Sequence, residues 1–195
     1  MSTTSTTLAP ELAVSEWFNT PAPLTLAALR GRPVFIHSFQ LLCPGCVSES
    51  IPQVQRIECI FGHTDLQVIG IHTVFEHHAA MSPVTLKAFL HEYRIKHPVG
   101  VDLSDERSDT PTTMQRFALR GTPSSILIGR DGSIAHQMFG VEEDLAVGAR
   151  IAMALSARIP GLAGTAPSSG EDEGCSGGRC EVPSQLDAGR LARMS

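Results

Sequence analysis

The chain has 195 residues, of which 42% are hydrophobic and 18% are charged, so it can build one domain with a hydrophobic core and is not expected to be disordered throughout. The formal net charge is -5 and aromatic residues make up only 5%, so neither the basic face of a nucleic-acid binder nor a platform for stacking bases is expected. The sequence also lacks a run of about 18 apolar residues, so a membrane-spanning helix is not expected.

The N-terminal sequence and the cysteine count together favour a cytoplasmic protein. Residues 1–15 are rich in Ser and Thr, are expected to be flexible, and show neither the basic start nor the apolar stretch of a secretory signal. The five cysteines form an odd set in a chain of this size, which argues against a framework of structural disulfides. In a reducing cytoplasm, closely spaced cysteines are more often catalytic or metal-binding.

The predicted elements begin with a short helical turn over residues 24–29. A near-continuous apolar run over 34–39 follows and predicts a buried strand. The next helix is expected to begin at Pro44, because proline suits the first helical position, and to kink early at Pro52. The later elements, in chain order, are a strand at 66–74, a helix at 82–93, a strand at 97–101, a short helix at 110–117, strands at 125–128 and 133–138, and a helix at 145–155.

This alternation predicts an α/β fold with a central mixed sheet and helices on both faces. Strand–helix–strand units imply right-handed crossovers between parallel strands. The dipeptide Asp131-Gly132 is a strong hairpin signal and adds an antiparallel edge. Spacing on the last helix predicts four inward residues: Leu145, Ile151, Ala152 and Leu155.

The composition divides the chain into one domain and two flanking segments. The domain is expected to span 16–158, after the flexible N-terminus of residues 1–15. Residues 159–195 are rich in Gly, Ser and acidic residues and contain a second cysteine pair, Cys175 and Cys180. We expect this tail to be flexible.

The chemistry is concentrated in Cys43-Pro44-Gly45-Cys46, which follows the buried strand and begins a helix. The unpaired N–H groups and partial positive charge at a helix start stabilise a thiolate on Cys43, and a thiolate is the species that attacks disulfides. Cys46 lies one helical turn on, close enough to form a disulfide with Cys43. Cys43 is therefore the predicted nucleophile and Cys46 the resolving thiol, and neither a metal nor a prosthetic group is expected.

At this point the sequence resembles the thioredoxin superfamily, in particular its TlpA-like and peroxiredoxin-like redoxins. The resemblance spans about residues 17–157 and includes the strand–CxxC–helix unit, the tripeptide Gly121-Thr122-Pro123 before a strand, and the segment 23–31 before the first core strand. A strand–helix stretch inserted at roughly 63–95 is typical of the redoxin branch. Leu42 stands where thioredoxin-like proteins often have Trp, and Pro-Gly reverses the more familiar order inside the pair.

The resemblance implies a thiol–disulfide oxidoreductase acting on protein or small-molecule disulfides, with a thiol as electron donor. It implies that Pro123 is cis and faces the cysteines, and that the Thr122 backbone positions an extended substrate beside Pro44 and Gly45. His37 occupies the position at which thioredoxins hold an acidic residue beneath the second cysteine. A neutral imidazole there could accept the Cys46 proton; the alternative is a core histidine with a purely structural role.

Two other functions stay open on the sequence. A peroxidase is the first, since Arg120 resembles the arginine that peroxiredoxins place near their reactive thiolate. However, a peroxidatic cysteine needs Thr or Ser three residues earlier, and those positions are Cys43 (for Cys46) and Gln40 (for Cys43). A non-enzymatic module that binds a metal or a partner is the second. Zinc needs four ligands, which Cys175 and Cys180 could complete, although the same tail pair could instead shuttle electrons to the first pair or have no role.

Overall fold

A computed structural model describes residues 8–158. Its elements, in chain order, are β1 (Val14–Phe18), β2 (Val34–Phe39), η1 (Cys46–Ser50), α1 (Ile51–Phe61), β3 (Gln67–His72), α2 (Pro83–Glu92), β4 (Val99–Asp102), α3 (Thr112–Arg116), β5 (Ser124–Ile128), β6 (Ile134–Phe139) and α4 (Asp144–Ser156). The strands form one sheet in the order β1-β4-β3-β2-β5-β6. Strands β2, β3 and β4 run parallel, whereas β1, β5 and β6 pair antiparallel with their neighbours. The predicted mixed sheet and α/β class are confirmed.

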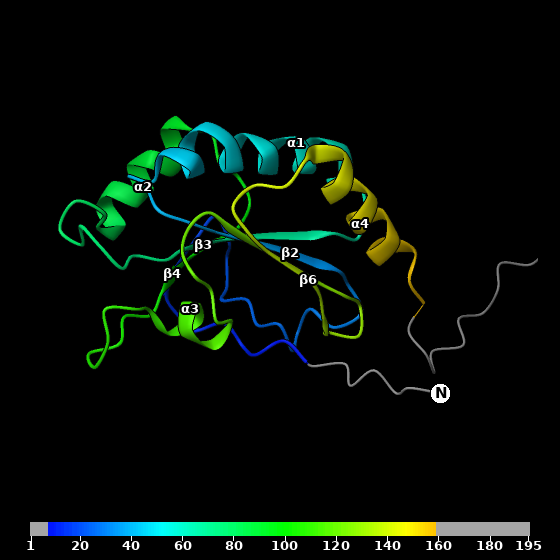
Figure 1. Cartoon of the computed structure of the whole chain (residues 1–195), viewed down its shortest axis with the longest axis horizontal. Helices are drawn as coiled ribbons and strands as arrows, with labels where there is room; N and C mark the ends of the chain where they lie inside the picture. The colour runs from blue at the N-terminus through cyan, green and yellow to red at the C-terminus, as the bar shows by residue number, and fades with distance from the viewer. Residues whose placement is uncertain (1–7, 159–195) are drawn as a thin grey trace, which may run out of the picture. The chain divides into compact units, whose positions relative to one another are not determined.

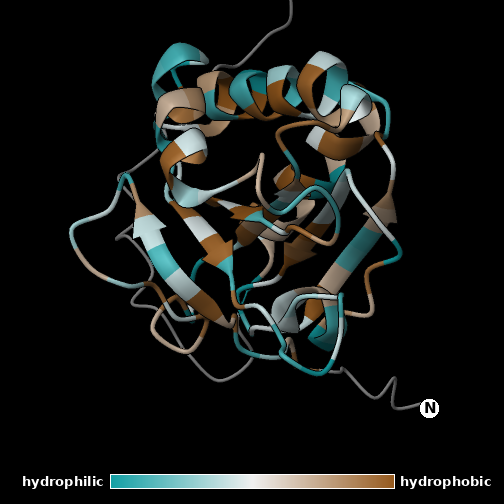
Figure 2. Cartoon of the chain, turned by 90° about the vertical axis from the view of Figure 1, so that its left-hand side faces the viewer, coloured by the Kyte–Doolittle hydropathy of each residue, from teal (hydrophilic) through white to brown (hydrophobic). Residues whose placement is uncertain are grey.

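Helices cover both faces of the sheet, as predicted. Helices α1, α2 and α4 lie over one face, and α3 lies over the other (Figure 1). Alternate residues of β2 serve the two faces: Val34 and Ile36 pack in one apolar cluster with Phe117, and Phe35 packs in another with residues of α1 and α4. Figure 2 shows the hydrophobic residues of the strands enclosed between these layers. Over residues 8–158, none of the helices has the length and apolarity needed to cross a membrane.

The domain begins earlier than the predicted residue 16. Leu8 forms a bridge with Ser133, Ala9 is buried in the core, and β1 starts at Val14. Strand β1 pairs antiparallel with β4 and forms one edge of the sheet. Residues 8–15 thus contribute two buried core residues, Ala9 and Ala13, and the first two residues of the edge strand. The predicted flexible tail, 159–195, lies outside the described residues.

The inward face of α4 is turned relative to the prediction. The buried residues are Val147, Ile151 and Ala154, which follow each other at four- and three-residue steps. Ile151 is confirmed as an inward residue, but Leu145 is 87% exposed in the first turn. Ala152 is also exposed, and Leu155 is half-buried. The apolar character of Leu145 misled the prediction, because the helix begins at Asp144 and places the Leu145 side chain on its outer face.

Helical geometry begins at Pro44, as predicted, but the next turn is wider than an α-helix. Segment η1 is a π-helical turn, closed by the N–H of Ile51 donating to the carbonyl of Cys46. Pro52 follows directly, in the first turn of α1. Proline has no N–H to donate, and its ring clashes with the carbonyl four residues earlier. The wider turn removes that clash, so the predicted distortion at Pro52 takes the form of a π turn beside the cysteine pair.

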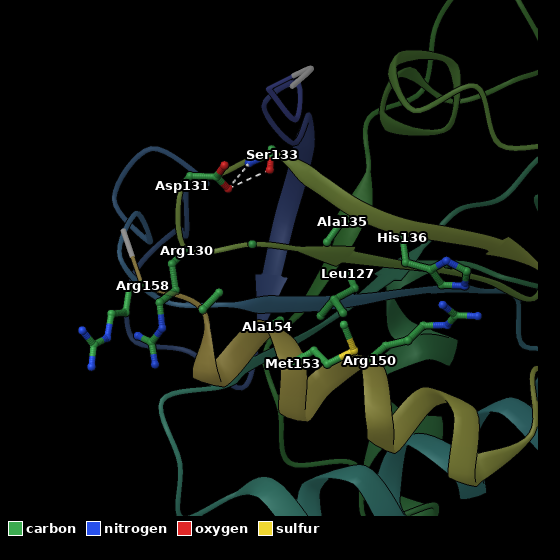
Figure 3. A pocket seen from close by; sticks show the side chains of 12 residues that line it. Leu127, Arg130, Asp131, Ser133, Ala135, His136, Arg150, Met153, Ala154 and Arg158 are labelled. Carbon is green, nitrogen blue, oxygen red and sulfur yellow. Dashed lines mark hydrogen bonds between the residues drawn. The ribbon is translucent and has the colours of Figure 1, made fainter. Parts of the chain in front are cut away.

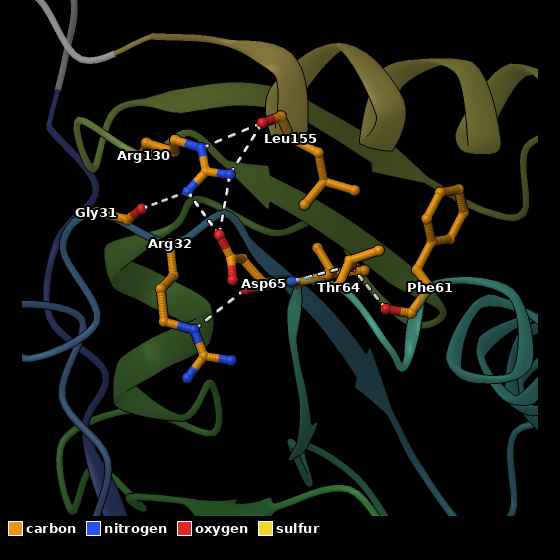
Figure 4. A network of polar contacts seen from close by, with 8 residues as sticks. Gly31, Arg32, Phe61, Thr64, Asp65, Arg130 and Leu155 are labelled. Atoms are coloured by element: carbon orange, nitrogen blue, oxygen red, sulfur yellow. Dashed lines mark hydrogen bonds and ion pairs between the residues drawn. The ribbon is translucent and has the colours of Figure 1, made fainter. Parts of the chain in front are cut away.

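Arg130 joins several elements at the opposite end of the sheet from the cysteines. Its guanidinium donates to the carbonyl oxygens of Gly31 at 2.7 Å and Leu155 at 2.9 Å, and contacts the Asp65 carboxylate at 3.2 Å (Figure 4). These partners belong to the turn before β2, the last turn of α4, and the residues before β3. The β5–β6 hairpin itself turns at Gly132, whose φ of +80° suits glycine.

Candidate active site at the cysteine pair

The two predicted cysteines lie side by side, with different exposure. Cys43 is partly exposed at the end of the loop after β2, and Cys46 is fully buried. The backbone N–H of Cys46 donates to the Sγ of Cys43 at 3.2 Å. Both are free thiols. An approaching disulfide therefore reaches the Cys43 sulfur first, and the Cys46 sulfur is shielded from it.

The buried thiol is held in its protonated form. Burial, and secondly the contact with Cys43, raise the pKa of Cys46 to about 12, although the Gln40 backbone and the Thr122 side chain oppose this shift. Cys46 is thus a poor nucleophile until its proton is removed. The pair combines an accessible sulfur that receives a backbone hydrogen bond with an inaccessible thiol that cannot react first.

The loop that precedes β5 faces the pair. The Thr122–Pro123 peptide bond is cis. The Cys43 thiol donates to the Thr122 carbonyl across 3.6 Å, and a Cβ atom added to Gly45 would lie 3.6 Å from the Pro123 ring. On the inner side, the Gln40 side-chain amide donates to the Thr122 hydroxyl at 3.3 Å. The structure therefore brings the predicted residues Cys43, Gly45, Thr122 and Pro123 together. Pro44, the remaining predicted residue of this group, is exposed at the helix start.

The hydrogen bonds of the described structure pair His37 with His97 rather than with Cys46. Its ring is fully buried, its Nε2 lies 2.8 Å from the Nε2 of His97, and its Nδ1 has no hydrogen-bond partner in the described structure. Burial, and secondly His97, hold the pKa of His37 well below its ordinary value. The geometry makes His37 half of a buried histidine pair, because its hydrogen-bonding nitrogen is directed at His97, just before β4, rather than at the cysteines.

The histidine pair extends to the surface through α1. His97 Nδ1 lies 3.0 Å from a carboxylate oxygen of Glu58, although it is not aligned for a hydrogen bond. Gly70 on β3 makes room for the pair, since a Cβ there would lie 2.9 Å from His37 Nε2 and 3.2 Å from His97 Nε2. Sequence reasoning missed His97, Glu58 and Gly70, because they are far apart in the chain and match no spacing rule.

Arg120 lies on the same loop as Thr122 and Pro123 but is hydrogen-bonded to neither sulfur. Its guanidinium carbon is 5.0 Å from the centroid of the Phe139 ring, over its face. The arginine expected near a peroxidatic thiolate is thus not tied to either sulfur by a hydrogen bond within the described residues. Arg120 and Phe139 are both exposed.

No cluster of three or more potential metal-ligating side chains occurs within residues 8–158. The tail cysteines Cys175 and Cys180, which would be needed for a four-cysteine zinc site, lie outside the described residues. The chemistry that the structure presents is therefore that of the Cys43–Cys46 pair itself.

Two cavities in the described residues differ in their distance from the cysteine pair. One, of about 450 Å³, lies between the β5–β6 hairpin and α4, against Leu127, Arg130 and Met153 (Figure 3). Since β5 runs antiparallel to β2, this hairpin is at the sheet end away from Cys43. The other, a groove of about 380 Å³, begins just after the pair, at Ser48 and Glu49, and continues along the loop before α4.

No protein-family model matches the chain. A solved structure of a thioredoxin-like superfamily protein superposes with a TM-score of 0.76 and is 49% identical, over 78% of this chain and 99% of the other.

The chain belongs to the thioredoxin-like superfamily. A second solved structure of this fold, a thiol-disulfide isomerase from Corynebacterium glutamicum, is 43% identical over 79% of this chain and 99% of its own, with a TM-score of 0.74. The resemblance inferred from the sequence motifs is confirmed.

Curated relatives of this superfamily member are more distant. The thiol-disulfide oxidoreductase ResA of Bacillus thuringiensis (strain Al Hakam) is 23% identical over 117 residues, which is 60% of this chain. The matched region spans 60% of the length of that relative. The ResA protein of Bacillus anthracis matches to the same extent.

Proposed function

We propose that the protein is a thiol–disulfide oxidoreductase that uses Cys43 and Cys46. The observation that carries the proposal is the arrangement of the two sulfurs: Cys43 is accessible and accepts a hydrogen bond from the Cys46 N–H at 3.2 Å, and Cys46 is buried beside it. An accessible cysteine attacks disulfides as its thiolate. The names of the similar thiol-disulfide isomerase and of the ResA relatives support the same reaction class.

The proposed reaction proceeds in two exchange steps. The Cys43 thiolate attacks one sulfur of the substrate disulfide, forms a mixed disulfide, and releases the first substrate sulfur as a thiolate. Cys46 then loses its proton and attacks the Sγ of Cys43, which forms the Cys43–Cys46 disulfide and releases the second substrate sulfur. Two electrons pass to the substrate, and the protons of the two protein thiols end on the two released thiols. A thiol donor re-reduces the pair, and no prosthetic group takes part.

The buried thiol gives the sequence of steps its direction. Because burial raises the pKa of Cys46 to about 12, Cys46 does not compete with Cys43 for the substrate. It becomes a nucleophile when the first substrate thiolate, released beside it, can take its proton. We propose that the protein works as a reductase in a cytoplasm; the reduction potential of the pair, measured against glutathione, tests this direction.

Serine substitutions test the assignment of the two sulfurs. Cys43→Ser is expected to reduce the rate of insulin disulfide reduction to that of the dithiothreitol background, because no attacking sulfur is left. Cys46→Ser is expected to keep the first attack and to accumulate a mixed disulfide on Cys43, which intact-protein mass spectrometry detects. Cys59→Ser, which removes an exposed free thiol on α1, is the matched control and leaves the rate unchanged. Full activity of the Cys43 variant would remove the proposal.

A further inference from the structure

We propose that Arg120, held over Phe139, selects disulfide substrates that carry a carboxylate close to the disulfide bond. This inference rests on the proposed function and names a substrate class for the same site. Its basis is a cation that has no ion-pair partner among residues 8–158, that precedes by two residues the Thr122 carbonyl facing Cys43, and that lies over the exposed Phe139 ring.

Arg120 and Phe139 both adjoin the Thr122–Pro123 segment that faces Cys43. Arg120 precedes Thr122 by two residues, and the Thr122 carbonyl lies 3.6 Å from the Cys43 Sγ. Phe139 ends β6, and the next residue, Gly140, donates its N–H to the Pro123 carbonyl at 2.8 Å. A substrate chain that reaches Cys43 across this loop therefore passes close to both side chains.

The Phe139 ring restricts where the cation can be. The guanidinium carbon is 5.0 Å from the centroid of the Phe139 ring, a distance at which the ring attracts a cation. The ring in turn packs on Gly121, where an added Cβ would lie only 3.0 Å from it. Phe139 nevertheless remains 47% exposed. The ring therefore serves as a fixed support that presents the Arg120 charge to the surface.

The charge of Arg120 is not neutralised by the part of the chain that the structure describes, where it makes no ion pair or hydrogen bond. This distinguishes it from the arginines around the neighbouring groove. Arg56 pairs with Asp144 at 2.6 Å, and Arg150 pairs with Glu142 at 2.9 Å. The strongest local preference for an anion is thus at Arg120. Glu49 and Glu143 line the same groove and make no ion pair among residues 8–158. These two carboxylates would favour a substrate with a positive charge, which is the opposite of the preference expected from Arg120.

A cation at this position changes which disulfides react well. The attacking sulfur is negatively charged, so a carboxylate next to the scissile bond repels it and slows the attack. Arg120 offsets that repulsion by pairing with the carboxylate as the substrate binds. The apolar part of the substrate can rest on Phe139 and on Leu42, which is 56% exposed next to Cys43.

Synthetic peptides with one intramolecular disulfide test the inference. Three sets place Asp, Asn or Lys at one, two or three residues from the cysteine, and kcat/KM is measured for each peptide. We expect a roughly two- to fivefold preference for Asp over its neutral isostere Asn in at least one set, the range set by the strength of exposed ion pairs. Arg120→Gln removes the preference, and Arg120→Lys retains part of it. Raising the salt concentration reduces it, because an exposed pair is screened.

Arg158→Gln is the matched control, since it deletes the same charge at the far end of α4 and leaves the preference unchanged. Equal rates for Asp and Asn in all three sets, a preference for Lys, or a preference that survives Arg120→Gln would each overturn the inference while leaving the oxidoreductase intact. If the wild-type protein reduces none of the nine peptides and insulin is also not reduced, it is the proposed function that fails.

Discussion

His72 is buried at the end of β3, and neither of its ring nitrogens has a hydrogen-bond partner in the described structure. It lies beside Phe39, with the ring centroids 5.6 Å apart. Burial lowers its pKa from 6.5 to about 4, because a charged imidazole would be left without solvent or a counter-ion. The unfolded chain therefore takes up a proton at a pH at which the folded protein does not.

This difference makes stability depend on pH in a predictable direction. The contribution of a neutral His72 is fully present above about pH 6.5 and is lost as the pH falls toward 4. The free energy of unfolding is expected to drop by about 3 kcal/mol over this range from His72 alone. The low pKa of His37 acts in the same direction. His72→Leu should remove the His72 part, and urea titrations at several pH values measure it.

His91 provides the control for this measurement, since its side chain is 86% exposed. His91→Gln should keep the full pH dependence of the wild type. An undiminished loss of stability in His72→Leu would show that other groups cause it.

The residues of the site differ in how far the sequence could predict them. Cys43 and Cys46 lie within four residues, so helix geometry alone places one beside the other. Thr122 was reached through the family resemblance, which supplied a contact that local spacing cannot. The His37–His97 contact was out of reach, because it depends on the register of β2 against β3 and on the absence of a side chain at Gly70.

At the scale of elements, the central strands and most helices follow from hydrophobic patterns, and the failures have physical causes. Strand β1 was missed because it is a sheet edge whose middle residues are exposed, so no apolar run marks it. The phase of α4 was misjudged because one exposed leucine fits the apolar pattern. Pro52 correctly predicted a distortion, but whether a helix bends or widens depends on the packing of Cys46 and Ile51, which the sequence does not reveal.

The start of α3 depends on a carboxylate from another element. Asp102, at the end of β4, accepts hydrogen bonds from the N–H of Thr113 at 2.7 Å and of Met114 at 3.0 Å, and from the Thr73 hydroxyl at 2.8 Å. It is only 4% exposed. One side chain thus satisfies two of the free donors at a helix start and ties α3 to β4 and to the residue that follows β3.

Asp102→Ala is expected to lower the free energy of unfolding by about 3 kcal/mol, because it leaves three donors without an acceptor in a buried place. Asp102→Asn keeps the side-chain volume and one acceptor oxygen, so its free energy of unfolding should lie between those of the wild type and Asp102→Ala. Chemical denaturation at pH 7 measures both. Asp109→Ala, which changes an exposed residue in the loop before α3, is the control, and equal stability of the two alanine variants would refute the capping role.

At the scale of the described domain, the cysteine pair and the Arg130 hydrogen bonds lie at opposite ends of the same sheet. The parallel strand β2 leads into the cysteine pair at its carboxyl end, and Ser38 at that end pairs with Ser124, just after Pro123. At its other end Val34 pairs with Ile128, beyond which Arg130 begins the hairpin. We therefore expect that weakening the end with the Arg130 contacts leaves the sulfurs in place.

Arg130→Ala tests this separation. The variant loses hydrogen bonds from a charged group to the carbonyls of Gly31 and Leu155, so the free energy of unfolding should fall by about 2 kcal/mol. The pair with Asp65 adds little, because that carboxylate is 66% exposed. Arg130→Lys keeps the charge but cannot reach all three partners at once, and should recover less than half of the loss. Below the unfolding transition, kcat/KM for disulfide reduction should stay at the wild-type value in both variants. A fall in kcat/KM that parallels the loss of stability would instead mean that the hairpin end of the sheet helps to position Pro123 against the cysteines.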